Sequence, residues 1–201
     1  MAAAAACLFL LCILGSAVAL GAGGGTATIT AAGRIGDVQI DHSDRSAIVA
    51  YAGEPEVDVT VGAAPPVGGW EGLGYQCSSI YTDAPFVVSA GTEGPYCRTV
   101  FYLDPKTGLL ATFFTSMPGF VDGHGVSVGT RTAKAVRLEG APAVAGCGEG
   151  IRLTTPSTYF HLVIGGGHLH QHGHQLLVRG GRVTAIVLHS RGNDVGNFDC
   201  L

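Results

Sequence analysis

The stretches IDHSDRSAIVAYAGEP (residues 40–55) and SVGTRTAKAVRLEGAP (residues 127–142) decide the fold of this 201-residue chain. When they are aligned on their shared Gly-x-Pro endings, Ser43 falls on Thr130. Both are residue types that cap helix N-termini, because a side-chain oxygen can accept from the free amides of the first turn. We therefore expect a short helix in each stretch and interpret the two as copies of one internal repeat.

The rest of each stretch supports this interpretation. Ile48 in the first and Val136 in the second lie on the apolar face of a helix about ten residues long. Gly53 and Gly140 are expected to end the helices in the left-handed conformation, and the proline two residues later prevents continuation.

Sequence typical of β-strands follows each helix. Turns at 105–108 and 179–182 predict two hairpins, whereas the Gly/Pro-rich residues 62–74 predict a long surface loop. The fold class we predict is α+β: two tandem repeats, 33–120 and 121–201, each a short helix followed by an antiparallel meander, with the helices packed on one sheet face of one compact unit. The expected strands are 76–81, 99–103, 109–115, 150–154, 159–164, 174–178 and 183–189.

The N-terminus has the character of a leader. Residues 2–25 carry no charge, and an apolar run ends in the small residues 17–19, so we predict a signal peptide over 1–19 and a flexible spacer over 20–32. The alternative is an uncleaved membrane anchor, since nineteen apolar residues can span a bilayer. Either interpretation places the protein outside the cytoplasm, secreted or in the cell envelope.

Four cysteines follow the leader: Cys77, Cys97, Cys147 and Cys200. An even number in an exported chain predicts two disulfides, for which three pairings are possible. Because the cysteines divide two per repeat, we predict Cys77–Cys97 and Cys147–Cys200.

The tandem unit resembles two known families, the β-lactamase inhibitor protein family and the small outer-membrane assembly lipoproteins. One disulfide per half is closer to the former. The segments CRTVFYL (97–103), TGLLATFFTS (107–116) and GCGEGI (146–151) are also similar to exported bacterial proteins of unknown function. The resemblance covers residues 33–201 and implies a non-catalytic binding or scaffold role. The chain has no lipobox cysteine and no residue-by-residue match to an inhibitor's contact loop.

Composition and motifs exclude several functions. With 11 Lys+Arg against 15 Asp+Glu, the formal net charge of −4 leaves no basic footprint for nucleic acid. No nucleophile elbow, metalloprotease helix, phosphate loop or dinucleotide fingerprint occurs in the sequence. We therefore expect neither an enzyme nor a resident cofactor.

One histidine-rich segment has chemical character. If it is extended, its alternate residues share one face and two imidazoles can chelate a divalent ion, Zn²⁺ or Ni²⁺, at a weak surface site. His161 and His189 are candidates for a third ligand. The alternative is a solvated hairpin tip without metal. The four histidines are His168, His170, His172 and His174.

Two functions remain. The first is an exported, non-catalytic binding or interaction module whose partner is an unknown protein or cell-envelope component. Trp70 on the Gly/Pro loop, with Tyr75 nearby, would anchor that partner, unless Trp70 folds back over the sheet. The second is a metal-binding or metal-dependent exported protein that uses the cluster from His168 to His174. Contact with a membrane is expected only through an uncleaved leader.

Overall fold

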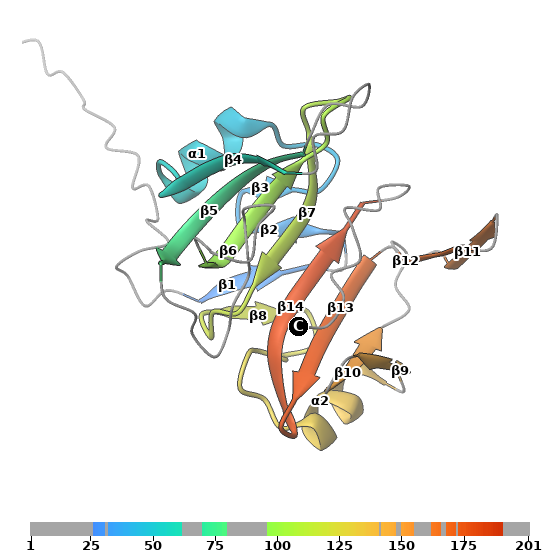
Figure 1. Cartoon of the computed structure of the whole chain (residues 1–201). Helices are drawn as coiled ribbons and strands as arrows, with labels where there is room; N and C mark the ends of the chain where they lie inside the picture. Colours follow the sequence, from blue (N-terminus) through green and yellow to red (C-terminus); the bar gives the residue numbers. More distant parts are fainter. Residues whose placement is uncertain are drawn as a thin grey trace, which may run out of the picture.

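The computed structural model describes most of the chain between residues 26 and 190 (Figure 1). The predicted leader and Cys200 lie outside the described residues, so the leader and the Cys147–Cys200 disulfide remain predictions. The described residues are 26–30, 32–61, 70–79, 96–140, 142–147, 150–154, 162–165, 168–171 and 173–190.

A large antiparallel sheet forms the centre of the molecule (Figure 1). Its eight strands lie in the order β4-β5-β6-β7-β14-β13-β10-β9, and every neighbouring pair is antiparallel. Together with two helices this confirms the predicted α+β class. In chain order the strands are β4 Val57–Val61, β5 Trp70–Ser78, β6 Tyr96–Leu103, β7 Leu110–Thr115, β9 Ala143–Cys147, β10 Gly150–Thr154, β13 Gly173–Arg179 and β14 Arg182–His189.

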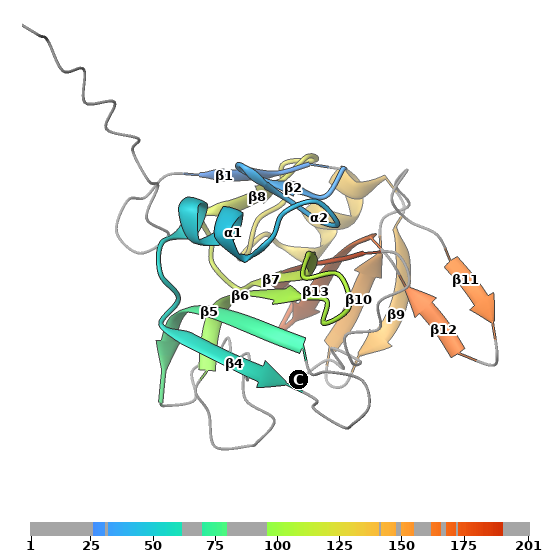
Figure 2. The same cartoon turned by 90° about the horizontal axis from the view of Figure 1, so that it is seen from above.

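Helices α1 (Arg45–Ala52) and α2 (Thr132–Glu139) lie on one face of this sheet, beside a small sheet of order β3-β2-β1-β8 (Figure 2). Within the small sheet, β1 pairs in parallel with β8, which comes much later in the chain. A separate hairpin is formed by β11 and β12. These six strands are β1 Ala27–Ile29, β2 Arg34–Ile35, β3 Val38–Gln39, β8 Phe120–Asp122, β11 Leu162–Gly165 and β12 His168–Gln171.

Both faces of the large sheet carry apolar side chains. On the helix side, Phe101 and Phe113 lie opposite each other with ring centroids 5.0 Å apart, and Ile48 of α1 packs into the same core. The opposite side, which we call the second face, carries a smaller cluster. Its buried members are Cys97, Val100, Tyr102, Phe114, Ala185 and Val187.

The helix ends correct one expectation and confirm another. The N-cap of α1 is Asp44, whose Oδ1 accepts from the amide of Ala47 at 2.9 Å, and α2 begins after Arg131 without a side-chain cap. The predicted caps Ser43 and Thr130 were therefore wrong by one residue. Their carbonyls instead accept from strand amides, which holds the chain before each helix against the large sheet. As expected, glycines with positive φ end both helices, but only Gly140 is in the left-handed helical conformation, whereas Gly53 combines φ 86° with ψ −175°.

The predicted surface loop was wrong in its last part, because β5 begins at Trp70. Gly72 and Gly74 alternate along β5 and face the second side, where Gly72 lies opposite Tyr102 and the disulfide fills the space at Gly74. A Cβ at Gly74 would lie 2.5 Å from the sulfur of Cys97. These glycines therefore make room in a strand and do not mark a loop.

The predicted Cys77–Cys97 disulfide is present and joins directly opposed residues of β5 and β6. Both predicted hairpin turns are also present. The turn at 105–108 joins β6 to β7, with Gly108 donating to the carbonyl of Asp104 at 2.8 Å. The turn at 179–182 joins β13 to β14 with two glycines at positive φ.

We expect Gly74→Ala to destabilise the protein by about 1–3 kcal/mol, because the added methyl group overlaps the disulfide and forces the strands apart. The matched control is Gly123→Ala, whose Cβ would lie 3.7 Å from its nearest neighbour and should change stability by less than about 0.5 kcal/mol. Urea unfolding followed by the fluorescence of Trp70 measures both. Equal unfolding midpoints for the two variants would contradict this account of β5.

Candidate functional site

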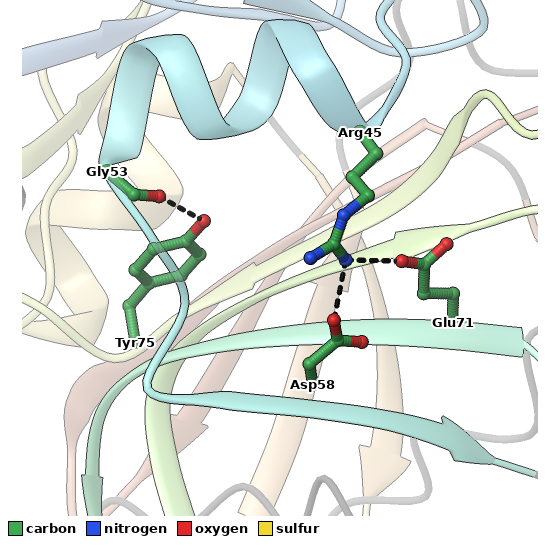
Figure 3. A network of polar contacts seen from close by, with 5 residues as sticks. All are labelled: Arg45, Gly53, Asp58, Glu71 and Tyr75. Atoms are coloured by element: carbon green, nitrogen blue, oxygen red, sulfur yellow. Dashed lines mark hydrogen bonds and ion pairs between the residues drawn. The ribbon is translucent and has the colours of Figure 1, made fainter.

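Strand β5 places the two predicted partner-binding residues in different surroundings. Trp70, at its start, is partly exposed and packs against the second-face cluster. Tyr75 points to the helix side and is only 4% exposed. Its hydroxyl donates to the carbonyl of Gly53 at 3.0 Å, and its ring meets Phe101 edge-on (Figure 3). Tyr75 is thus a core residue that holds the end of α1, and a partner reaching β5 would meet Trp70.

The second face carries apolar side chains on its middle strands. Val100, Phe114 and Val187 form a continuous row because they lie directly opposite one another on β6, β7 and β14. An antiparallel sheet with one solvated face normally alternates apolar and polar residues, so a second apolar face needs to be covered. The row itself is almost fully buried. Partly exposed apolar residues surround it: Val57, Val59, Trp70 and Leu177.

Two of these surrounding residues, Val57 and Val59, belong to β4, which our sequence analysis did not identify as a strand. In the part of the chain that the structure describes, β4 pairs with β5 alone and forms the edge of the sheet. The alternation VDVTV over 57–61 is the signal that could have found it. Val57 and Val59 share one face and Asp58 and Thr60 share the other.

Buried polar groups lie at the centre of the second face. The Oγ1 of Thr112 and the Nδ1 of His189 are 3.2 Å apart on directly opposed residues of β7 and β14. Tyr102 lies opposite Thr112 on the other neighbouring strand, and burial raises the pKa of its hydroxyl. His189 therefore serves this buried contact.

On the helix side, a charged network fastens α1 to the sheet edge. The guanidinium of Arg45 contacts Glu71 of β5 at 2.5 Å and Asp58 of β4 at 2.7 Å (Figure 3). Hydrogen bonds to Glu71 and then to Asp58 raise the pKa of Arg45. All three side chains are about two-fifths exposed, at 38–44%. Solvent screening limits each such exposed pair to about 0–1 kcal/mol, so the network orients α1 more than it stabilises it.

This network borders a shallow groove of about 540 Å³ between α1 and the sheet. Three carboxylates and one guanidinium line it, which gives the groove an acidic character. Such a surface attracts cationic groups, and the hydroxyl of Ser46 in it donates to the Oδ1 of Asp44 at 2.7 Å. The lining residues are Asp44, Arg45, Ser46, Val49, Glu54, Glu71, Leu103 and Gly108.

The structure divides the histidine-rich segment between two sheets. His168 and His170 belong to β12, His174 belongs to β13, and His172 lies outside the described residues. The expectation of a single strand is therefore wrong for His174. The side chains of this segment also lie outside the described part, so metal binding there remains a prediction.

The buried hydroxyl of Tyr75 predicts a defined response to alkaline pH. Burial raises its pKa to about 12, above the value of 10.0 for an exposed tyrosine. The folded state therefore holds this proton more tightly than the unfolded state, and its contribution is lost as pH rises from about 10 towards 12. We expect Tyr75→Phe to cost about 1 kcal/mol at pH 7, from the lost hydrogen bond.

The difference in unfolding free energy between wild type and Tyr75→Phe should narrow above pH 10, as measured by urea unfolding at pH 7, 9, 10.5 and 11.5. The comparison isolates Tyr75, because the other tyrosines are present in both proteins. A constant difference up to pH 11.5 would show that the hydroxyl is not held in this environment.

In the described part of the chain, neither helix has the length and apolar character needed to cross a membrane. No protein-family model, curated protein or solved structure matches the sequence or the fold.

Proposed function

We propose that this protein is an exported, non-catalytic binding module that receives a protein partner at the β4–β5 edge of its large sheet, on the second face. The observation that carries the proposal is the partly exposed apolar surface formed there by Val57, Val59 and Trp70. An apolar surface with a tryptophan at the rim of a sheet is typical of interaction sites.

The edge position of β4 adds a second means of recognition. In the described structure its outer backbone groups have no neighbouring strand, so they can accept an extended segment of a partner. The backbone would supply affinity, and the valine face would select apolar residues at alternate positions of the partner. Arg45 already contacts Asp58 on the charged face of β4. The apolar face is therefore the one that would select between partners.

Export is supported by the disulfide. Such bonds persist in oxidising compartments and are rare in the cytosol. Cys77–Cys97 lies beside the partner surface, where it joins β5 to β6. A covalently held strand pair provides a rigid platform for the neighbouring Trp70.

We further propose that the fold arose from a duplicated unit of one helix and four antiparallel strands. The strand order supports this, since β4 to β7 run inward from one edge, β9, β10, β13 and β14 run inward from the other, and each set follows a helix. Equivalent hydrogen bonds recur: Leu110 donates to the carbonyl of Ser43 at 2.7 Å, and Val183 to that of Thr130 at 2.8 Å. A tandem unit of this kind fits the binding role that the family resemblance implies.

A second candidate function is metal binding by the cluster His168, His170, His172 and His174, with Zn²⁺ or Ni²⁺ as the ion. The observation that favours it is the placement of His168 and His170 at alternate positions of β12. We rank it second because His174 belongs to a different strand.

The binding proposal is tested by Val59→Arg against its matched control Thr60→Arg. Both place the same charge on the same edge strand, but only Val59 lies on the second face. The chain and its variants are immobilised and exposed to an envelope extract of the source cells, and the retained proteins are quantified by mass spectrometry.

We expect a partner retained by wild type and Thr60→Arg and reduced at least tenfold by Val59→Arg. If Val59→Arg lowers the unfolding midpoint, the experiment is repeated with Val59→Thr, because threonine has the shape of valine and adds only a hydroxyl group. Equal retention by all variants would contradict docking on this face.

A further inference from the structure

Three potential metal ligands meet on the helix side of the molecule, away from the proposed partner surface. Asp122 ends β8, His124 follows two residues later, and Glu139 ends α2. One ligand atom from each lies within 4.8 Å of the other two. The Nδ1 of His124 and the Oε2 of Glu139 are 3.0 Å apart. Our sequence analysis did not single these residues out, because they come from separate elements.

The backbone fixes the first of these ligands. The Oδ1 of Asp122 accepts from the amides of His124 at 2.9 Å and of Val126 at 2.8 Å. This carboxylate is therefore held in one orientation before any ligand binds. Preorganised ligands lose little freedom when they coordinate an ion, which favours binding.

Burial makes the arrangement costly without a cation. Asp122 is 4% exposed and Glu139 is 5% exposed, although both also take part in other interactions. Within the described structure, the Oδ2 of Asp122 and the Oε1 of Glu139 are buried atoms that accept no hydrogen bond. Buried carboxylates are normally paired or coordinated to metals, because removing their charge from water is expensive.

We propose that Asp122, His124 and Glu139 bind one Zn²⁺ ion. One imidazole nitrogen and two carboxylates are ligands that zinc accepts in proteins, and the charge of +2 balances both carboxylates. The side chain of His124 is 47% exposed, so an ion can enter from solvent and keep water as a further ligand. The bound ion would join β8 to the end of α2 and so hold the small sheet to the helix.

The alternative is a simple ion pair between a protonated His124 and Glu139. Asp122 would then only accept hydrogen bonds from the backbone of the turn that follows it. The two interpretations predict opposite behaviour of Glu139→Gln. With an ion pair, this variant is less stable than wild type whether or not metal is present. With a zinc site, it is at least as stable as wild type in the absence of metal, because one buried charge is removed, and it gains nothing from zinc.

The test uses the full, untagged chain freed of metal by a chelator and dialysis. Isothermal titration with Zn²⁺ gives affinity and stoichiometry, and thermal unfolding with and without Zn²⁺ gives the stabilisation. The main variant is His124→Ala, which removes a half-exposed side chain together with its contact to Glu139. Its matched control is His42→Ala, another exposed histidine. The double variant His170→Ala/His172→Ala separates this site from the histidine-rich segment.

We expect wild type, His42→Ala and the double variant to retain a one-to-one zinc site and a zinc-dependent rise in unfolding temperature. His124→Ala and Glu139→Gln should lose at least tenfold in affinity and lose the rise. The proposal is overturned if wild type binds no zinc, or if the double variant alone abolishes binding. It is also overturned if metal-free Glu139→Gln is less stable than wild type and zinc changes neither protein.

Discussion

The pairing of β7 with β14 holds the two halves of the chain in one sheet (Figure 1). Alternation along these strands sends Phe113 and Leu188 into the helix-side core and Phe114 and Val187 into the second-face cluster. Each half alone is a four-stranded sheet with an open edge where its partner now lies. Both apolar clusters draw residues from both halves, so each is complete only when the two strands have joined.

Much of this arrangement could be predicted from local sequence. Signals within a few residues predict the helix ends at Gly53 and Gly140 and the hairpin at 105–108. The Cys77–Cys97 pair follows from the number of cysteines in each half of the chain. The first part of strand β5 could not be predicted in this way. Gly74 is required there because Cys97 on the neighbouring strand leaves no room for a side chain, and such a tertiary cause is absent from the local pattern.

The candidate sites were harder to predict for the same reason. Trp70 and Tyr75 are close in sequence, yet β5 places them in different surroundings, and the side that each faces depends on where the strand begins. The predicted helix caps were wrong by one position, because the backbone carbonyls of Ser43 and Thr130 accept hydrogen bonds from strand amides. Asp122 and Glu139 come together only through the packing of α2 beside β8. Short-range sequence patterns thus identified most of the helices and strands. The candidate sites depend instead on contacts between elements that are distant in the sequence.

The parallel pairing of β1 with β8 has a kinetic consequence. Residues 27–29 are the first described strand of the chain and pair locally with β2, but their parallel partner, residues 120–122, comes only after the entire first helix and its four strands. Closing so long a loop is entropically unfavourable until the intervening segment has become compact. The first of the described strands is therefore expected to form this parallel pairing late, when the small sheet closes over a core that has already formed.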